Sequence, residues 1–253
     1  MTTPLDLYLV QTQLTWQNST QNLLRLGWHI QRATPHSLIV LPEMFSTGFT
    51  MNPSEYAETM DGLTVNWMKE LSADRAICGS VAIKEDGKFY NRFIAVYKGE
   101  IICVYNKQML FSYGQEHLHY SAGTESVFFV FGGWKIVPFI CYDLRFPHIQ
   151  QLNESPDLML FVANWPSKRM LAWNTLLRAR SIENVCYVAG VNRVGEDGNG
   201  IKHNGCSQVI DYSGEYRVEP IKDNEILIQS TLEMKPMSQF REKFPFLSDK
   251  PVY

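Results

Sequence analysis

The sequence predicts a single-domain α/β layered sandwich, with mixed sheets and helices packed on their outer faces. Helical segments alternate with short apolar runs that are typical of buried strands, and hairpin signals interrupt this alternation. No internal repeat, low-complexity segment or linker divides the 253 residues. Because layered α/β folds often reach this length undivided, we expect one domain over residues 1–253.

The N-terminal segment is expected to form a strand and then a helix. Residues 5–11 (LDLYLVQ) are mostly apolar and have strand character. Ser19 or Thr20 is suited to cap a helix that runs to about residue 32. The apolar positions of this helix are Leu23, Leu24, Leu26, Trp28 and Ile30.

The next segments predict a buried strand, a second helix and two hairpins. Residues 37–41 (SLIVL) form a short apolar run that leads into Pro42-Glu43, which is typical of a strand buried on both faces. Residues 62–74 have helical character. Between residues 76 and 106, three runs with β character are separated by two turn signals, EDGK and KGE.

The C-terminal half alternates apolar strands with helical patterns. Strands are expected at residues 134–142, 158–163 and 185–191, with two or three more within residues 207–232. A short helical pattern begins at Pro147, and a separate helix is expected over residues 171–184. This order of elements is what a layered sandwich with mixed sheets requires.

Composition argues against several classes of function. The net charge is −3, so we expect no basic surface for nucleic acid. No basic segment precedes the first apolar stretch, and no run approaches the ~18 apolar residues of a membrane span, so neither a signal peptide nor a membrane partner is expected. The five cysteines are scattered and form no CxxC pair, which favours free thiols in a reducing cytoplasm.

Three apolar strands end abruptly in a reactive polar residue. SLIVLPE ends at Glu43, IICVYNK at Lys107 and WKIVPFIC at Cys141. Ligands of layered α/β proteins sit outside the carboxyl ends of strands, so these three side chains are candidates for one pocket. The thiol would be a nucleophile, the carboxylate would take its proton, and the ammonium would stabilise developing negative charge.

Each of these residues also has a structural interpretation. A single cysteine at the end of an apolar strand is more often an inert core thiol. Glu43 could equally be an exposed loop residue, and Lys107 alone is typical of a surface charge. Periodicity alone does not show that the three side chains meet.

Three sequence blocks resemble the signature blocks of the nitrilase superfamily, the carbon–nitrogen hydrolases. They are VLPEMFSTGF, YNKQMLF and ICYDLRFP, with Glu, Lys and Cys in the family's order at intervals of 64 and 34 residues. The similarity extends to FVANWP, RARSIENVCYV and a C-terminal Arg-Glu-Lys, and so covers nearly the whole chain. The EHLHYSAG block and the short length are most similar to the omega-amidase branch. The resemblance implies a four-layer α-β-β-α sandwich.

The resemblance also implies a role for each catalytic candidate. Glu43 is the general base, Cys141 the nucleophile, and Lys107 the oxyanion partner, together with the backbone N–H of Tyr142. Glu116 matches the family's second active-site glutamate, which orients Lys107 and assists proton transfer. The implied substrates are small dicarboxylate monoamides of the 2-oxoglutaramate, 2-oxosuccinamate and succinamate class, which would lose ammonia through a thioester.

Other candidates are less specific. Arg145 could bind a substrate carboxylate, although pairing with a structural acid such as Asp143 is the favoured interpretation. Phe45 and Trp165 are equally suited to line the pocket or to fill core. His117 and His119 form an HxH pair, but no third ligand has a recognisable spacing, so we expect no metal and no cofactor.

Other activities remain open from the sequence. They are a nitrilase, a carbamoylase or another amidase within the superfamily, and, from different classes, a thiol peroxidase or a non-catalytic interaction protein. The expected partner is a small amide substrate. The resemblance and the apolar Phe244-Pro-Phe246 segment also lead us to expect a homodimer or a larger homo-oligomer.

Overall fold

The computed structural model describes residues 3–150 and 155–249. Its strands are β1 (Leu5–Gln11), β2 (Leu38–Val40), β3 (Ala76–Glu85), β4 (Lys88–Tyr97), β5 (Glu100–Asn106), β6 (Phe129–Phe131), β7 (Trp134–Ile140), β8 (Leu158–Ala163), β9 (Tyr187–Asn192), β10 (Val194–Glu196), β11 (Lys202–Ile210), β12 (Tyr216–Lys222) and β13 (Ile226–Leu232). Its α-helices are α1 (Ser19–Ile30), α2 (Pro53–Tyr56), α3 (Leu63–Leu71), α4 (Glu116–His119), α5 (Met170–Asn184) and α6 (Met234–Lys243). No helix in these two ranges is long and apolar enough to cross a membrane.

Two mixed sheets form the centre of the molecule. The first has the strand order β13-β1-β2-β3-β4-β5, and the second has the order β10-β11-β9-β8-β7-β6 with β12 paired to β11. Strands β1, β2 and β3 run parallel, as do β7, β8 and β9, whereas the outer pairs are antiparallel. The prediction of mixed sheets is therefore confirmed.

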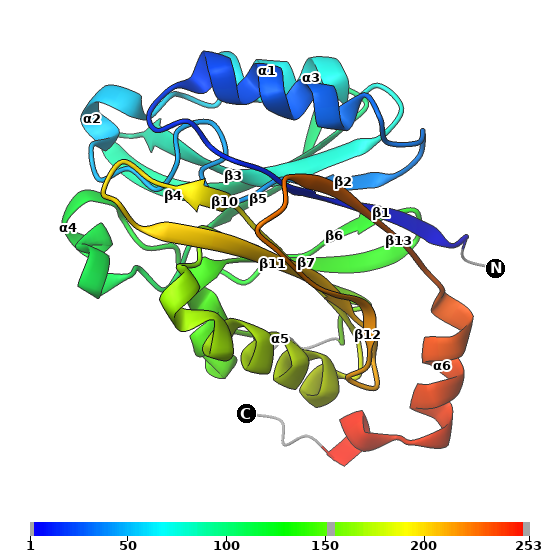
Figure 1. Cartoon of the computed structure of the whole chain (residues 1–253). Helices are drawn as coiled ribbons and strands as arrows, with labels where there is room; N and C mark the ends of the chain where they lie inside the picture. The colour runs from blue at the N-terminus through cyan, green and yellow to red at the C-terminus, as the bar shows by residue number, and fades with distance from the viewer. Residues whose placement is uncertain (1–2, 151–154, 250–253) are drawn as a thin grey trace.

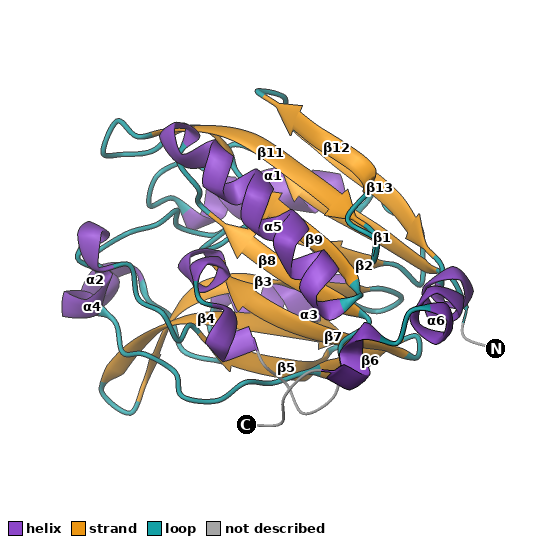
Figure 2. Cartoon of the chain, turned by 90° about the horizontal axis from the view of Figure 1, so that it is seen from below, coloured by secondary structure: helices purple, strands orange, loops and turns teal. Residues whose placement is uncertain are grey.

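The four layers follow from the alternation of side chains along each strand. In β1, Leu5, Leu7 and Leu9 pack between the two sheets, whereas Tyr8 and Val10 pack beneath the helices on the outer face. Helices α1 and α3 cover the first sheet and α5 covers the second, as Figures 1 and 2 show. The predicted α-β-β-α sandwich is confirmed.

The predicted hairpins are confirmed, and their turns explain their sequences. Asp86 and Gly87 join β3 to β4 with φ values of 49° and 74°. Lys98 and Gly99 join β4 to β5 with φ values of 52° and 77°. Two consecutive residues with positive φ are typical of type I′ turns, whose twist matches the twist of paired strands.

Helix α1 differs from its prediction at its N-terminal cap. Asn18 caps it, because its side chain accepts a hydrogen bond from the backbone N–H of Gln21, so the prediction of Ser19 or Thr20 was one or two residues late. Of the apolar positions named for this helix, Leu24 and Trp28 are 73% and 58% exposed. Both lie on the solvent side of the helix, and Arg32 stacks over Trp28 with 4.4 Å between the guanidinium carbon and the ring centroid.

The strand predicted over residues 134–142 is two residues shorter. Strand β7 ends at Ile140, and a 3₁₀ turn covers Cys141–Arg145. The sequence also did not predict the short elements α2, α4, β6 and β10, nor α6 near the C-terminus. Most of these have four residues or fewer, which is too short for a periodic pattern.

Candidate active site

The three strand-end candidates line one cavity of about 920 Å³. Glu43 lies three residues after β2, and Lys107 directly follows β5, in the same sheet. Cys141 directly follows β7 in the second sheet. The cavity therefore opens where carboxyl ends of strands from both sheets converge.

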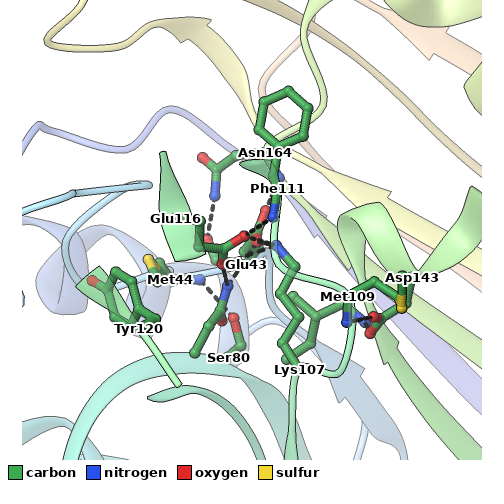
Figure 3. A network of polar contacts seen from close by, with 12 residues as sticks. Glu43, Met44, Ser80, Lys107, Met109, Phe111, Glu116, Tyr120, Asp143 and Asn164 are labelled. Atoms are coloured by element: carbon green, nitrogen blue, oxygen red, sulfur yellow. Dashed lines mark hydrogen bonds and ion pairs between the residues drawn. The ribbon is translucent and has the colours of Figure 1, made fainter. Parts of the chain in front are cut away.

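A buried ion cluster, which Figure 3 shows, includes Glu43 and Lys107 of the cavity lining. Nζ of Lys107 lies 2.9 Å from Oε1 of Glu43 and 2.9 Å from Oε2 of Glu116, and all three side chains are fully buried. Nδ2 of Asn91 donates to both carboxylates, at 2.8 Å to Glu43 and 3.1 Å to Glu116. One ammonium and one amide thus bridge two carboxylates that would otherwise repel each other.

Glu43 is held at both of its carboxylate oxygens. Oε1 accepts hydrogen bonds from Lys107 and Asn91, and Oε2 accepts one from the backbone N–H of Asn164 at 2.8 Å. The Asn164 side chain also donates to the backbone oxygen of Glu43 at 2.6 Å. The carboxylate is therefore fixed in direction as well as in position, which a general base requires.

Asp143 fixes the turn that carries Cys141. Its Oδ2 accepts hydrogen bonds from the backbone N–H of Ile140 at 2.9 Å and the hydroxyl of Tyr105 at 2.8 Å. Its Oδ1 accepts from the backbone N–H of Met109 at 2.9 Å. Because Met109 lies two residues after Lys107, Asp143 ties the turn around the thiol to the segment that carries the ammonium. Burial raises the pKa of Asp143 to about 6, so at pH 7 the group is a carboxylate that only accepts.

The substitution Asp143→Asn is expected to destabilise the fold by about 1–3 kcal/mol and to lower kcat. The amide group that replaces one oxygen would point an N–H at a backbone N–H or at the Tyr105 hydroxyl. Thermal unfolding and the rate of Cys141 alkylation would measure the two effects. Tyr105→Phe is the matched control, because it removes one donor and adds none, and unchanged stability and rate in Asp143→Asn would refute the assignment.

The thiol of Cys141 is neutral at rest. Burial raises its pKa well above the ordinary value, and the charge of Glu43 adds to this effect while Lys107 opposes it. Burial alone would lower the pKa of Lys107, but the charges of Glu116 and Glu43 outweigh it and raise the pKa. The site therefore holds a thiol beside a carboxylate and a permanent ammonium, so the thiol has to lose its proton when it attacks.

Strained backbone accompanies three of these functional groups. Met44, Gln115 and Cys141 have φ values of 42°, 60° and 47°, which are unusual for residues other than glycine. Met44 follows Glu43 and Gln115 precedes Glu116 in the chain. Strain of this kind persists only where the surroundings impose it, and it is common at active sites.

Phe45 and Arg145, two of the four candidate substrate-binding residues, each had two interpretations from the sequence. Phe45 does not line the cavity: it is fully buried in the core beneath α3, and a Cβ at Gly79 would lie 2.8 Å from its ring. Arg145 lines the cavity, but it is exposed and stacks over Trp165, with 5.3 Å between the guanidinium carbon and the ring centroid. The favoured pairing of Arg145 with Asp143 is thus wrong, because backbone N–H groups and Tyr105 surround that carboxylate.

The remaining predicted residues have clear positions. Tyr142 is half-buried and Trp165 is buried, and both line the cavity. His117 and His119 are exposed on α4. Among the described residues, no group of three or more His, Cys, Asp or Glu side chains is arranged to hold a metal.

Sequence reasoning missed several polar residues of the site. Asn91 lies in the middle of β4, and neither its type nor its spacing distinguishes it from an ordinary strand residue. Asn164 stands in the FVANWP block directly after β8, so its position at a strand end was an available signal. His203 lines the cavity from the second position of β11. No pattern in the sequence marks His203 as part of this site.

Comparisons with known proteins agree with this geometry. The family model described as "Carbon-nitrogen hydrolase" matches residues 8–242. Omega-amidase YafV of Escherichia coli is 41% identical over 97% of this chain and 96% of that protein. 2-Oxoglutaramate amidase of Bacillus subtilis is 30% identical over 95% of both.

A solved structure supports the same relationship. The CN-hydrolase superfamily protein XC1258 of Xanthomonas campestris, determined with an arsenic adduct in the active site, is 39% identical and has a TM-score of 0.94. The alignment covers 99% of this chain and 98% of that one. The resemblance inferred from the three sequence blocks is therefore confirmed, and the chain belongs to the carbon–nitrogen hydrolase family.

Proposed function

We propose that this hydrolase is an omega-amidase. It would cleave the terminal amide of small dicarboxylate monoamides, of the 2-oxoglutaramate, 2-oxosuccinamate and succinamate class, to the dicarboxylate and ammonia. The observation that carries the proposal is a neutral thiol on the same cavity as a buried Glu43–Lys107–Glu116 cluster. The relatives named omega-amidase and 2-oxoglutaramate amidase support the substrate class.

The first half of the reaction forms a thioester. Glu43 takes the thiol proton as Sγ of Cys141 attacks the amide carbon, and a C–S bond forms. The ammonium of Lys107 and the backbone N–H of Tyr142 stabilise the oxyanion of the tetrahedral intermediate. Protonated Glu43 then gives its proton to the amide nitrogen, the C–N bond breaks and ammonia leaves.

The second half returns the enzyme to its resting state. Glu43 deprotonates a water molecule, which attacks the thioester carbon and forms a second oxyanion stabilised by the same groups. The C–S bond breaks, and the thiolate recovers its proton from Glu43. Glu116 acts by orienting Lys107, which it contacts through both carboxylate oxygens at 3.1 and 2.9 Å.

The charge of the cavity wall supports an anionic substrate. Among the described residues, the cavity is lined by the cations Arg145, Lys168, Arg169 and Lys202, which lie outside the ion cluster. Asp197 lies on the same wall, but its Oδ1 accepts hydrogen bonds from the N–H groups of Asn199 and Ile201 in its own loop. A cleft with this excess of positive charge attracts carboxylates.

We expect kcat/KM for 2-oxoglutaramate or succinamate to exceed that for butyramide by at least ~10²-fold. The reacting amide is the same in all three, so the difference has to come from charge-assisted contacts at the acid end, which together contribute about 3 kcal/mol. Arg145→Leu should narrow this ratio if its guanidinium holds the carboxylate, and Arg145→Lys is the charge-matched control. Ammonia release measures all of these rates. If kcat/KM of the wild type is the same for butyramide and succinamate, the omega-amidase proposal fails. The more general proposal of a cysteine amidase would still stand.

One observation disfavours a thiol peroxidase. The other four cysteines, which would have to supply a resolving thiol, are buried. Other amidase, carbamoylase or nitrilase activities would be recognised by their own substrates in the same ammonia assay.

The proposal includes a cytoplasmic location and a homodimer or larger homo-oligomer. Leu171 and Ile182 on α5 and Phe246 near the C-terminus are 84%, 53% and 57% exposed, and burial in an interface would stabilise such apolar side chains. Multi-angle light scattering at micromolar concentration is expected to give at least twice the mass of 29.2 kDa. A monomeric mass would refute this part of the proposal.

A further inference from the structure

His203 is a polar side chain in the cavity wall to which the mechanism gives no role. It occupies the second position of β11, and the hydroxyl of Ser167 donates to the backbone oxygen of the preceding Lys202 at 2.9 Å. This contact joins the start of β11 to the segment after β8, and both line the cavity. His203 and Glu43 line the same cavity.

Nδ1 of the imidazole has no hydrogen-bond partner of normal geometry among the described residues, although the backbone of Ile201 lies near enough to the ring to raise its pKa. His203 is only 5% exposed, and its Nδ1 atom is fully enclosed. Nε2 is not enclosed in this way, so it is the ring nitrogen that reaches the cavity. A buried polar ring without a well-placed partner costs stability, and such costs are typical of residues kept for a ligand.

Arg193 determines the charge state of this ring together with burial. Its guanidinium is buried and donates to the backbone oxygens of Leu14, Val194 and Glu196. Burial and this positive charge lower the pKa of His203 to about 4, so the imidazole is neutral at pH 7.

A neutral imidazole carries one N–H proton, and the nitrogen that carries it is the hydrogen-bond donor of the ring. On Nδ1 the proton would be enclosed without a hydrogen-bond partner of normal geometry among the described residues. On Nε2 the proton can be donated into the cavity, which His203 lines. His203 therefore presents an N–H to whatever occupies the cavity.

We propose that His203 determines substrate specificity by donating this N–H to an oxygen at the acid end of the substrate. The acceptor is either the distal carboxylate or the 2-oxo group beside it. This inference rests on the proposed omega-amidase function and adds a neutral, directional contact to the diffuse charge of the arginines and lysines. His203 takes no part in the bond-making steps, so it acts on binding and positioning.

The test compares three variants on three amides of related shape. His203→Phe keeps the ring and removes both nitrogens, His203→Gln keeps a donor near the position of Nε2, and His203→Asn keeps one near Nδ1. The substrates are 2-oxoglutaramate, glutaramate, which lacks the 2-oxo group, and butyramide, which lacks both acid-end groups. The measured quantities are kcat and KM for ammonia release, with the unfolding temperature as a control.

His203→Phe is expected to lower kcat/KM for 2-oxoglutaramate about tenfold or more, mainly through KM, and to change butyramide less than about threefold. His203→Gln should keep most of the wild-type kcat/KM for 2-oxoglutaramate, whereas His203→Asn should not. If His203→Phe lowers kcat/KM equally for glutaramate and 2-oxoglutaramate, the carboxylate is the acceptor. If it lowers kcat/KM for 2-oxoglutaramate alone, the 2-oxo group is the acceptor. If the Phe variant does not fold, the difference between Gln and Asn, which are equally polar, decides the question.

Two results would overturn the inference. The first is an equal loss on all three amides, which would mean that His203 supports the wall only. The second is a Phe variant with the selectivity of the wild type. In both cases the proposed function survives as long as the wild type prefers acid-bearing amides, whereas a wild type without that preference refutes both.

Discussion

Replacing Cys141 by alanine is expected to lower kcat for ammonia release by at least about 10⁴-fold. The thiol provides the electron pair that forms the thioester, and no other nucleophile among the described residues of the cavity has a strained turn and a fixed base beside it. The other four cysteines are buried, so none of them can substitute. An assay of ammonia release with 2-oxoglutaramate measures the loss directly.

Labelling identifies the same thiol independently of activity. An alkylating reagent should inactivate the wild type with one label, at Cys141, and should leave Cys141→Ala unlabelled. Cys141→Ser is the matched control, because it keeps the size and hydrogen bonding of the side chain while weakening the nucleophile. A folded Cys141→Ala protein with full activity would contradict the mechanism.

The substitutions Glu43→Gln and Lys107→Met are each expected to lower kcat by roughly 10²-fold or more. In the first variant, the glutamine amide would keep the shape of the carboxylate but could not accept the thiol proton. In the second, the methionine side chain would keep most of the length of the lysine but would leave the oxyanion without its cation. Adding Glu43→Gln to Cys141→Ala should cost little more than Cys141→Ala alone, because the two residues act as one unit.

These two substitutions are also expected to lower stability. The sequence alone placed neither residue in the core and therefore predicted no such effect. Both side chains are fully buried in the ion cluster. Lys107→Met would leave two carboxylates facing each other and should destabilise the fold by about 3–5 kcal/mol. Glu43→Gln leaves Lys107 paired with Glu116, so its cost should be smaller. Thermal unfolding measures the difference, and a well-folded Lys107→Met enzyme with normal kcat would refute the role of the ammonium.

The fold could largely be predicted because local pattern and final structure agree. The run at residues 158–163 became β8 with identical bounds, since a buried strand in a parallel sheet has to be apolar on both faces. The triad could be proposed because each member follows an apolar strand. Glu116 follows no such strand and was found only through the resemblance. It lies on a helix of four residues, which has no periodicity of its own.

The rest of the site depends on contacts between distant segments. Asn91 bridges Glu43 and Glu116, which lie 48 and 25 residues away in the chain, and no local signal reports such a bridge. Phe45 and Trp165 each follow a polar residue of the site by one or two positions, yet only Trp165 faces the cavity. The direction of the chain after each strand decides this, and it is set by packing against the neighbouring layer.

The central claim is that Cys141 hydrolyses the terminal amide of dicarboxylate monoamides. Its most direct test is ammonia release across 2-oxoglutaramate, succinamate, butyramide and a simple nitrile, with wild type and Cys141→Ser side by side. We expect rapid release from the first two amides, at least ~10²-fold slower release from butyramide, and none above background from the serine variant. Release that persists in Cys141→Ser, or no release from either acid-bearing amide with a folded wild type, would contradict the account.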